Sequence, residues 1–166
     1  MFNLAEKNDD DQFALKCIRK DKISHDTYQI ELDFPNKEWT SGVWPGGHYK
    51  MHLESNGKWL CKPYSPISPL TRKGSVIFCI KIYREHPDFP DGGKFTQALE
   101  ANLNVGGSIL CEGPIGMINY QGYGNFTFKK KPFEHKKTTV GLIAGGTGIT
   151  PFFSIAQAAL LGNDGL

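Results

Sequence analysis

The sequence contains no hydrophobic run long enough to cross a membrane and almost no excess of charge of either sign. No run approaches the roughly 18 consecutive apolar residues that a membrane-spanning helix needs, and no cationic, apolar leader opens the chain. The 166 residues carry a formal net charge of +2, which is too balanced to indicate nucleic-acid binding. We therefore predict a protein without a membrane anchor of its own. It would be cytoplasmic, or held by partners at the cytosolic face of a membrane or in mitochondria.

Cysteine is scarce, and its spacing argues against two kinds of site. The four cysteines lie far apart and form no C-x-x-C pair, at positions 17, 61, 79 and 111. This spacing is typical neither of a zinc site nor of a small disulfide scaffold, and it favours a reducing compartment. His48 and His52 are four residues apart, as in many zinc-binding helices, but they follow a Pro-Gly-Gly turn in a segment typical of a strand. We predict no metal site.

Short apolar or alternating runs, separated by turn residues, fill residues 13–128. Four clear examples are residues 13–18, 27–34, 49–53 and 76–83. Runs of this length and period predict an antiparallel sheet or barrel. In residues 27–34 apolar and polar side chains alternate, so this strand is expected to bury one face. Turns are expected at residues 45–47 and 113–116, and residues 94–103 have the one helical pattern in this region.

The pattern changes near residue 139, where alternation gives way to a continuous apolar run. Residues 140–144 are typical of a buried strand, and residues 150–161 are helical in pattern. Between them lie three closely spaced glycines, Gly145, Gly146 and Gly148. The order of elements is therefore predicted to be strand, loop and helix.

The start of this second helix has the features of an anion site. Thr150 is expected to cap its first free amides, Pro151 to lie in its first turn, and Gly162 to end it. Amides at a helix start point at an anion, and glycines let a phosphate, or a ring that carries one, approach the backbone. The alternative is a tight turn with no ligand.

These changes divide the chain into three parts. Residues 1–12 are predicted to be a flexible acidic tail, residues 13–135 a β-barrel domain, and residues 136–166 a linker with the first strand, loop and helix of an α/β domain. The last part is shorter than a βαβ unit of about 30 residues or more, so we interpret this domain as incomplete. A strand that is apolar on both faces needs a cover, which predicts a partner chain over residues 140–161.

The segment KPYSPIS, residues 62–68, supplies complementary groups for a phosphate and a flat ring. In an extended strand Lys62 and Tyr64 share a face, so the cation can meet a phosphate while the phenol, braced by Pro63, presents its ring to a heterocycle. Ser65 can hydrogen-bond to a polar ring edge. The alternative is a proline-braced edge strand in which Tyr64 is a core residue.

Two further segments indicate polar sites. Gly92-Gly93-Lys94-Phe95-Thr96 precedes a helix, so its free amides and the Thr96 hydroxyl could hold a pyrophosphate. An ordinary glycine turn with an N-cap is the alternative. In Ile80-Lys81-Ile82-Tyr83, alternation places Lys81 and Tyr83 on one face of a strand, although Lys81 could equally extend to solvent.

Five lysines lie among aromatic residues near the predicted domain boundary. They are Lys129, Lys130, Lys131, Lys136 and Lys137, and Phe126, Phe128 and Phe133 lie between or beside them. A nucleic-acid surface is one interpretation of such a cluster. A solvated linker or a docking face for an acidic protein is favoured because the whole chain is nearly neutral.

Six motifs follow one another along the chain: WPGGHYKM, KPYSPIS, IKIY, HPDFPDGGKFTQAL, GPIGMINYQGYGNF and GLIAGGTGITP. In this order and spacing they resemble the NADH-cytochrome b5 reductase family of ferredoxin-reductase-like flavoproteins, from about residue 13 to the end. The resemblance implies an all-β antiparallel FAD-binding barrel of the Greek-key type with one helix, followed by an incomplete α/β nucleotide-binding domain. It also implies an FAD-dependent oxidoreductase, in which a hydride passes from NADH to the flavin and single electrons then pass to a haem protein such as cytochrome b5.

The resemblance assigns roles to individual residues. Tyr64 would pack on the isoalloxazine, and Ser65 would hydrogen-bond near its reactive nitrogen. Lys81 and Tyr83 would lie beside the flavin and the incoming nicotinamide, and Thr150 would belong to the loop that closes on the ring. The residues predicted to act at the reacting side are Tyr64, Ser65, Lys81 and Thr150. The predicted cofactor-binding set is Lys62, Pro63, Tyr64, Ser65, Ile80, Lys81, Tyr83, Gly92, Gly93, Lys94, Phe95, Thr96, Gly145, Gly146, Thr147, Gly148, Thr150 and Pro151.

Two departures from the family keep other interpretations open. Lys62 stands where the family usually has arginine, which replaces a bidentate phosphate clamp by a point charge and predicts weaker flavin binding. The later strands of the NADH domain and its CGPPPM-like motif are not in this sequence. One alternative is a non-catalytic scaffold subunit of a larger complex, with residues 140–161 as its interface. Another is a flavin-binding or sensor module without electron transfer.

Overall fold

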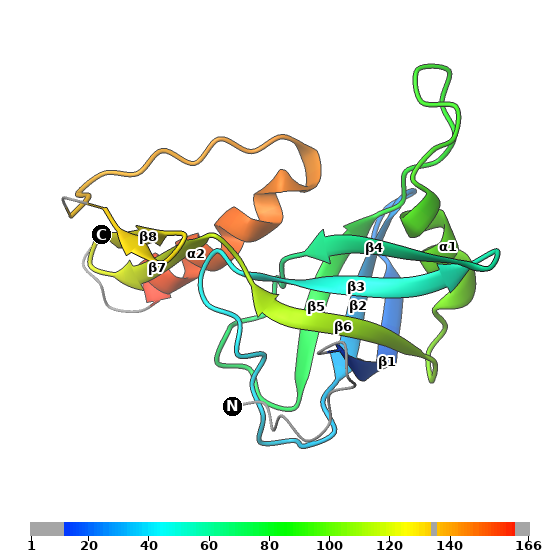
Figure 1. The fold of residues 1–166 in the computed structure, drawn as a ribbon, viewed down its shortest axis with the longest axis horizontal. Helices are drawn as coiled ribbons and strands as arrows, with labels where there is room; N and C mark the ends of the chain where they lie inside the picture. Colours follow the sequence, from blue (N-terminus) through cyan, green and yellow to red (C-terminus); the bar gives the residue numbers. More distant parts are fainter. Residues whose placement is uncertain (1–11, 134–135, 162–166) are drawn as a thin grey trace.

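The computed structural model describes residues 12–133 and 136–161 (Figure 1). Residues 1–11 of the predicted tail and the predicted helix-ending Gly162 lie outside the described residues. Gln12, the last residue of that tail, is already the first residue of a strand. The domain boundaries near residues 12 and 135 stay predictions.

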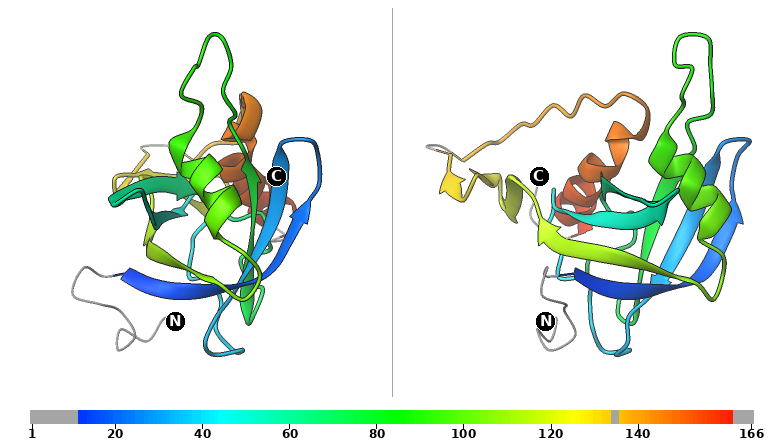
Figure 2. Two further views of the ribbon diagram at one scale, coloured as in Figure 1. Left: turned by 90° about the vertical axis from the view of Figure 1, so that its right-hand side faces the viewer. Right: turned by 45° about the vertical axis from the view of Figure 1, so that its right-hand side comes forward.

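A six-stranded antiparallel sheet forms the larger part of the molecule. Its strands are β1 (Gln12–Lys22), β2 (Thr27–Asp33), β3 (His48–Ser55), β4 (Lys58–Tyr64), β5 (Ser75–Lys81) and β6 (Ser108–Ile115). They are hydrogen-bonded in the order β4-β3-β6-β1-β2-β5. The sheet curls strongly, so that β4 and β5 at its two ends approach each other across the interior (Figures 1 and 2). This confirms the predicted antiparallel, barrel-like fold.

The core of the curled sheet consists of side chains that alternate along the strands. In β2, Ile30 and Leu32 are fully buried, and Phe34 continues the same row just beyond the strand. The rings of Tyr49 in β3 and Phe78 in β5 are fully buried, with centroids 6.2 Å apart. Full burial of a side chain such as Phe78 contributes about 1.5–3 kcal/mol. The alternation therefore produces one continuous core across the sheet.

One polar residue of β2 is buried, which the simple alternation did not predict. The Glu31 carboxylate accepts hydrogen bonds of 2.6 Å from Arg72 Nη2 and from Ser75 Oγ. Burial alone would raise the pKa of Glu31, but these hydrogen bonds lower it below its usual value. The outer face of β2 thus carries a charge whose partners come from the loop before β5 and from β5 itself.

One helix and a small second sheet complete the first part of the chain. Helix α1 (Lys94–Asn102) lies over one end of the curled sheet, close to β3 and β4, as the helical pattern of residues 94–103 predicts. Strands β7 (Ile118–Gly122), β8 (Asn125–Phe128) and β9 (Lys131–Pro132) form the separate three-stranded sheet. The turn expected at residues 113–116 is largely wrong, because β6 continues through Ile115, which pairs with His48 after a shift in register.

The predicted strand at residues 140–144 is wrong. These residues have no strand structure and are exposed, and Ile143 retains 93% of its surface. A strand that is apolar on both faces needs neighbouring strands and covering layers. In the described part of the chain, no strand pairs with residues 140–144. The segment instead forms an arch that leads to the short helix η2 (Gly146–Gly148) and to α2 (Ile149–Leu161) (Figure 1).

Helix α2 packs against the small sheet and is tied to a turn of the barrel. Ile155 lies in a small cluster with Tyr120 and Phe126. Ser154 is almost fully buried, and its hydroxyl oxygen accepts a hydrogen bond of 3.0 Å from the Gly46 N–H. Neither helix within residues 12–133 and 136–161 is long and apolar enough to cross a membrane.

Candidate functional site

A groove of about 920 Å³ lies between the edge strand β4, the loop after β5 and the start of α1. We call it the central groove. It brings together many residues of the predicted cofactor-binding set: Lys62, Pro63, Tyr64, Tyr83, Gly92, Gly93, Lys94, Phe95, Thr96 and Thr147. These residues come from four separate stretches of sequence, and the fold places them around one cavity.

The β4 wall of the central groove has the predicted alternation. Lys62 pairs with the core residue Met51 and Tyr64 with the core residue Tyr49, so both side chains lie on the inner face of β4. The Tyr64 ring is half-buried, and its centroid lies 5.6 Å from that of Phe95. Tyr64 therefore packs against the core and also lines the groove, which reconciles the two sequence interpretations.

Burial raises the pKa of the Tyr64 phenol far above its usual value, with a smaller contribution from Tyr83. Tyr64 is consequently neutral at physiological pH. A neutral aromatic ring on the wall of a groove presents a π-face against which a flat heterocycle can stack. The electrostatics of this wall come from Lys62 instead.

The start of α1 forms the second wall, and its first backbone donors have no acceptor among the residues that the structure describes. The N-cap residue Gly93 makes no side-chain cap, and the first intrahelical hydrogen bond is the 3.0 Å bond from Gln97 N–H to the Gly93 carbonyl. The amides of Lys94, Phe95 and Thr96 therefore have no acceptor within the helix. Such amides, at the positive end of the helix dipole, are a suitable site for an anion.

The glycines before α1 are required by close packing. Gly92 has a φ of +58°, in the left-handed region that favours glycine. A Cβ atom on Gly93 would lie 2.6 Å from Thr96 Oγ1 and 2.9 Å from Tyr83 Cβ, closer than real side chains allow. The predicted role of Thr96 changes, because its hydroxyl donates to the Gly93 carbonyl and accepts from the Tyr83 N–H. It shapes the turn rather than pointing into open space.

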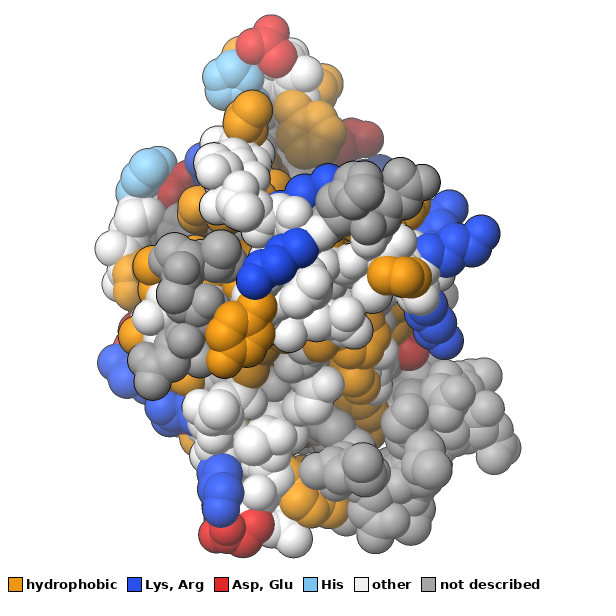
Figure 3. Space-filling model, turned by 90° about the vertical axis from the view of Figure 1, so that its left-hand side faces the viewer, with side chains coloured by type: hydrophobic (Ala, Val, Ile, Leu, Met, Phe, Trp, Pro, Cys, Tyr) orange, Lys and Arg blue, Asp and Glu red, His pale blue; other side chains and the backbone are white. Residues whose placement is uncertain are grey.

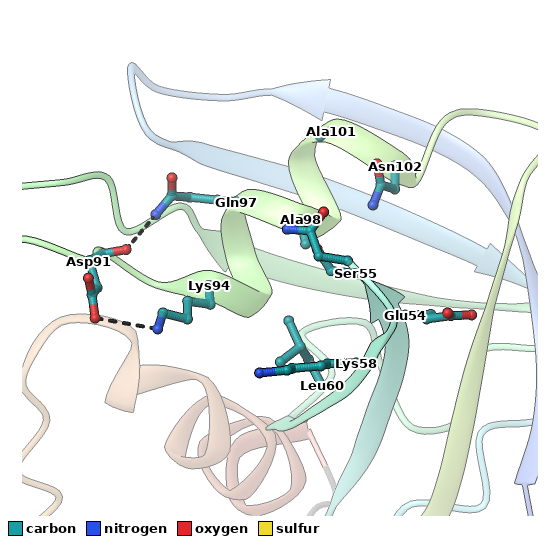
Figure 4. Close-up of a pocket in the computed structure, with 11 residues that line it drawn as sticks. Glu54, Ser55, Lys58, Leu60, Asp91, Lys94, Gln97, Ala98, Ala101 and Asn102 are labelled. Atoms are coloured by element: carbon teal, nitrogen blue, oxygen red, sulfur yellow. Dashed lines mark hydrogen bonds and ion pairs between the residues drawn. The ribbon is translucent and has the colours of Figure 1, made fainter.

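A second groove of about 1,010 Å³ continues along α1 (Figure 4). It shares Leu60, Asp91 and Lys94 with the central groove, so the two are neighbouring parts of one depression. In Figure 4, Lys58 projects from β4 and Lys94 from α1, and Lys94 Nζ lies 3.4 Å from the Asp91 carboxylate. The junction of the two grooves is therefore polar and carries cations from two elements.

Several predicted site residues lie away from the central groove. Ile80 is a core residue with 1% exposure, and Ser65 is buried and does not line the groove. The Lys81 ammonium lies 3.2 Å from the Asp26 carboxylate, on the outer side of β5. Burial would raise the pKa of Asp26, but hydrogen bonds from Thr27, Lys81 and Ser24 lower it to about 2. Lys81 thus has a structural partner, which neither sequence interpretation had named.

The glycine loop contributes a single side chain to the central groove. Thr147 lines it, and its hydroxyl lies 3.2 Å from the Tyr83 hydroxyl. Thr150 does not cap the helix as predicted, since α2 begins at Ile149 and the Thr150 hydroxyl donates to the Thr147 carbonyl at 3.1 Å. Pro151 follows Thr150 in the first turn of α2, as predicted. The loop glycines Gly145, Gly146 and Gly148 do not line either groove.

Sequence reasoning missed several residues that line the central groove. They are Trp59, Leu60, Cys61, Phe89 and Asp91. Trp59, Leu60 and Cys61 of β4 were not predicted, because the motif drew attention to one face of the strand only. An edge strand can present both of its faces and its free edge to a ligand. Phe89, 50% exposed in the loop that projects beyond α1 (Figures 1 and 2), was part of the motif HPDFPDGG but had no assigned role.

The predicted absence of metal stays a prediction. Among the described residues, no group of three or more histidine, cysteine and acidic side chains is arranged to hold a metal ion. His52 instead pairs with the Glu112 carboxylate at 3.2 Å. All four cysteines are free thiols.

Comparison with known proteins places these features in context. Residues 14–120 match the family described as Oxidoreductase FAD-binding domain. The chain is 38% identical over 160 residues to NADH-cytochrome b5 reductase 3 of Rattus norvegicus, covering 93% of this chain and 53% of that protein. It is 35% identical to Nitrate reductase [NADH] 1 of Arabidopsis thaliana, over 95% of this chain and 17% of that protein.

Among solved structures, the cytochrome b5 reductase domain of Ulva prolifera nitrate reductase superimposes with a TM-score of 0.84 and 32% identity. That match covers 95% of this chain and 59% of the other. The chain spans about half the length of the b5 reductase that it matches in Rattus norvegicus.

Proposed function

The chain belongs to the oxidoreductase FAD-binding domain family, as a domain of the NADH-cytochrome b5 reductase type, and from this premise we propose that its central groove holds FAD. The observation that carries the proposal is the meeting of Lys62, the Tyr64 ring and the free amides of α1 around one cavity. Each of these groups complements a different part of a flavin nucleotide.

The groups present in the groove fit this cofactor. The amides of Lys94 and Phe95 have no acceptor within the helix and suit a diphosphate, with Lys62 and Lys94 as counter-charges. A Cβ atom on Gly93 would collide with Tyr83, so only glycine fits the tight Gly92-Gly93 turn. Without side chains, this turn also lets a phosphate approach the backbone. The neutral Tyr64 ring provides the surface for the flavin rings.

When bound, FAD supplies the redox chemistry, because it accepts a hydride and can pass electrons on one at a time. The residues of the chain bind and orient it. Tyr64 and Phe95 exclude water from one side of the groove, and Lys62 balances the negative charge of the phosphates. Lys81 stays paired with Asp26, so its positive charge is largely balanced by the Asp26 carboxylate.

The experiment is a titration of FAD into the purified 166-residue chain. Quenching of flavin fluorescence is the signal that reports binding. We expect saturable binding at micromolar FAD. Removing the Lys62 cation in Lys62→Ala is expected to weaken binding about ten- to hundredfold, because a hydrogen bond to a charged group contributes about 1.5–3 kcal/mol. Lys62→Arg, which restores a planar bidentate donor, should tighten it.

Lys16→Ala, an exposed lysine on β1 outside the groove, is the matched control and should bind like the wild type. Absence of saturable binding in both the wild type and Lys62→Arg would contradict the proposal. Equal loss of affinity in Lys62→Ala and Lys16→Ala would show that the groove is not the site.

We further propose NADH as the electron donor and a haem protein such as cytochrome b5 as the acceptor, in an assembly that supplies the rest of the nucleotide domain. Relatives named NADH-cytochrome b5 reductase and nitrate reductase support this. So do the five lysines at 129–131, 136 and 137, which are exposed at the end of the molecule that carries β8 and β9. Figure 3 shows lysine and arginine side chains among apolar ones on this end.

The lysine cluster suits an acidic docking partner. Lys129 and Lys130 both have left-handed φ angles, 50° and 65°, in the turn between β8 and β9. Binding of cytochrome b5 to the FAD-loaded chain should weaken as ionic strength rises, and more so after removal of these charges. Binding that is insensitive both to salt and to Lys129→Glu with Lys130→Glu would contradict this docking face.

A specific observation favours a second candidate, a non-catalytic subunit in a larger complex. Many apolar residues of the arch and of α2 are exposed: Val140, Leu142, Ile143, Ile149, Phe153, Leu160 and Leu161. A partner chain over residues 140–161 would cover them. This candidate predicts a colourless chain that co-purifies with its partner, whereas a yellow monomer would exclude it.

For either candidate we infer a cytoplasmic location. The chain would be free, or held by partners at a membrane or in mitochondria, and imaging of the tagged chain would test this.

A further inference from the structure

Tyr83 connects three parts of the central groove. Its backbone is fixed to the start of α1, because its N–H donates to Thr96 Oγ1 at 3.1 Å and its carbonyl accepts the Gly93 N–H at 2.7 Å. Its ring projects into the groove and ends in a hydroxyl that lies 3.2 Å from the Thr147 hydroxyl, 64 positions away in sequence. Tyr83 therefore connects the start of α1, which forms one wall of the groove, to the glycine loop.

Thr147 is the partly buried residue of this loop, and its hydroxyl contacts the Tyr83 hydroxyl after β5. From residue 136 to residue 149, among the described positions, every residue except Thr147 is exposed. The loop glycines show how loosely the rest lies, because a Cβ atom added to Gly145, Gly146 or Gly148 would meet nothing within 4 Å. Besides its continuity with α2, the loop is therefore joined to the wall of the groove by the contact between Thr147 and Tyr83.

The Tyr83 ring is also held from its other side. Lys81 Nζ lies 5.8 Å from the ring centroid, within the range of a cation–π contact, and the same ammonium is bound by Asp26. The α1 turn thus holds the Tyr83 backbone, and Lys81 contacts its ring. The loop is the movable partner of this pair.

We propose that the hydrogen bond between Tyr83 and Thr147 is a latch that holds the glycine loop over the mouth of the central groove. Tyr83 is a positioning residue for the loop. The consequence for flavin rests on the proposed function: a flavin that enters or leaves between Tyr64 and the loop must wait for the latch to open. The latch itself exists without flavin and can be measured in the apo chain.

The first test is hydrogen exchange of the apo chain, measured by mass spectrometry on peptides that cover residues 141–153. Tyr83→Phe removes only the phenol oxygen, and Thr147→Val removes the hydroxyl from the other side. Each should speed exchange in residues 145–148 about two- to tenfold, since a net hydrogen bond is worth about 0.5–1.5 kcal/mol. Thr147→Ser keeps the hydroxyl and should restore slow exchange.

The controls separate a latch from general loosening. Tyr28→Phe also removes one phenol hydrogen bond, the 3.0 Å bond to Glu100, which does not involve the glycine loop. It should leave exchange of the loop unchanged. The double variant Tyr83→Phe with Thr147→Val should be no faster than either single variant, because both remove the same bond. Loop exchange in Tyr83→Phe that matches the wild type or Tyr28→Phe would overturn the latch.

The second test is the rate of FAD release, measured as the recovery of free-flavin fluorescence after rapid dilution of the FAD-loaded chain into buffer. Tyr83→Phe should release FAD about two- to tenfold faster, and Thr147→Ser should release it at the wild-type rate. Fast loop exchange with an unchanged release rate would overturn the gating role of the latch. If no variant binds FAD while the exchange results hold, the proposed function fails and the latch stands.

Discussion

The curled sheet and residues 136–161 are both rich in apolar residues, but the sheet buries them whereas residues 136–161 leave many of them exposed. In the sheet, Phe78 and Leu32 are fully buried, whereas Ile143 and Leu160 in the arch and α2 retain 93% and 73% of their surface. The difference follows from hydrogen bonding as much as from hydrophobicity. Strands β1 to β6 all find partners among themselves, and residues 140–144 find none in the described chain.

This comparison shows that an apolar sequence becomes a core only where the chain also supplies its neighbours. The core of the sheet, with the residues that α1 adds to it, lies within residues 12–115, and each of the six strands is hydrogen-bonded to a neighbour in that range. The segment after residue 136 is attached mainly through the contacts of α2 with the small sheet and with the Pro45-Gly46-Gly47 turn. Substitutions in the two regions should therefore have very different effects.

The largest effect is expected in the core of the sheet. Phe78→Ala removes a fully buried ring that lies beside Tyr49, and should lower the free energy of unfolding by about 3–5 kcal/mol. The measurement is urea denaturation followed by circular dichroism. Phe153→Ala, at an exposed position on α2, is the control and should change the same quantity by less than about 1 kcal/mol. Equal losses in the two variants would contradict the comparison.

An intermediate effect is expected where the two regions meet. Ser154→Ala leaves the half-buried Gly46 N–H without its acceptor, and should cost about 0.5–1.5 kcal/mol, the net value of one hydrogen bond. Hydrogen exchange should place the loss in α2 and in residues 44–47, with the strands β1 to β5 still protected. Ser108→Ala, at an exposed position of β6, serves as the control. A uniform loss of protection over the whole sheet would show that α2 is an integral part of the core instead.

The sequence allowed much of the first region to be predicted and little of the second. Alternation located the strands and the Gly-Gly-Lys start located α1, because both signals are local and their partners lie within the chain. The same apolar signal at residues 140–144 predicted a strand that is not formed, since its pairing depends on neighbours that the described residues do not supply.

Within the site, contiguous motifs and the alternation along β4 were predictable, whereas contacts between distant segments were not. Lys62, Tyr64 and Gly93 were found because each lies in a short motif with its own chemistry. Ile80 points into the core and Ser65 is buried just after the end of β4, so neither lines the groove. The latch between Tyr83 and Thr147 joins residues far apart in sequence, and no local pattern indicates it.

A small and pH-dependent effect is expected at the edge of the sheet. The pKa of Asp26 falls from 3.8 to about 2 in the folded chain, because hydrogen bonds from Thr27, Lys81 and Ser24 outweigh burial. A depressed pKa stabilises the folded state above the unfolded value, and this contribution is lost as pH falls from about 3.8 towards 2. The free energy of unfolding should therefore depend less on pH in this window for Asp26→Asn than for the wild type. Identical slopes for the two proteins would contradict the assignment.

The smallest effect is expected at the exposed apolar residues of the arch. Ile143→Ser removes a side chain that contacts almost nothing, so the free energy of unfolding of the chain alone should change by less than about 0.5 kcal/mol. If a partner chain covers residues 140–161, the same substitution should weaken the complex by about 1.5–3 kcal/mol, because a buried isoleucine then becomes a buried serine. Comparing the two measurements decides whether the exposed surface is an interface. A substitution without effect in either would mean that Ile143 remains in solvent in the complete assembly as well.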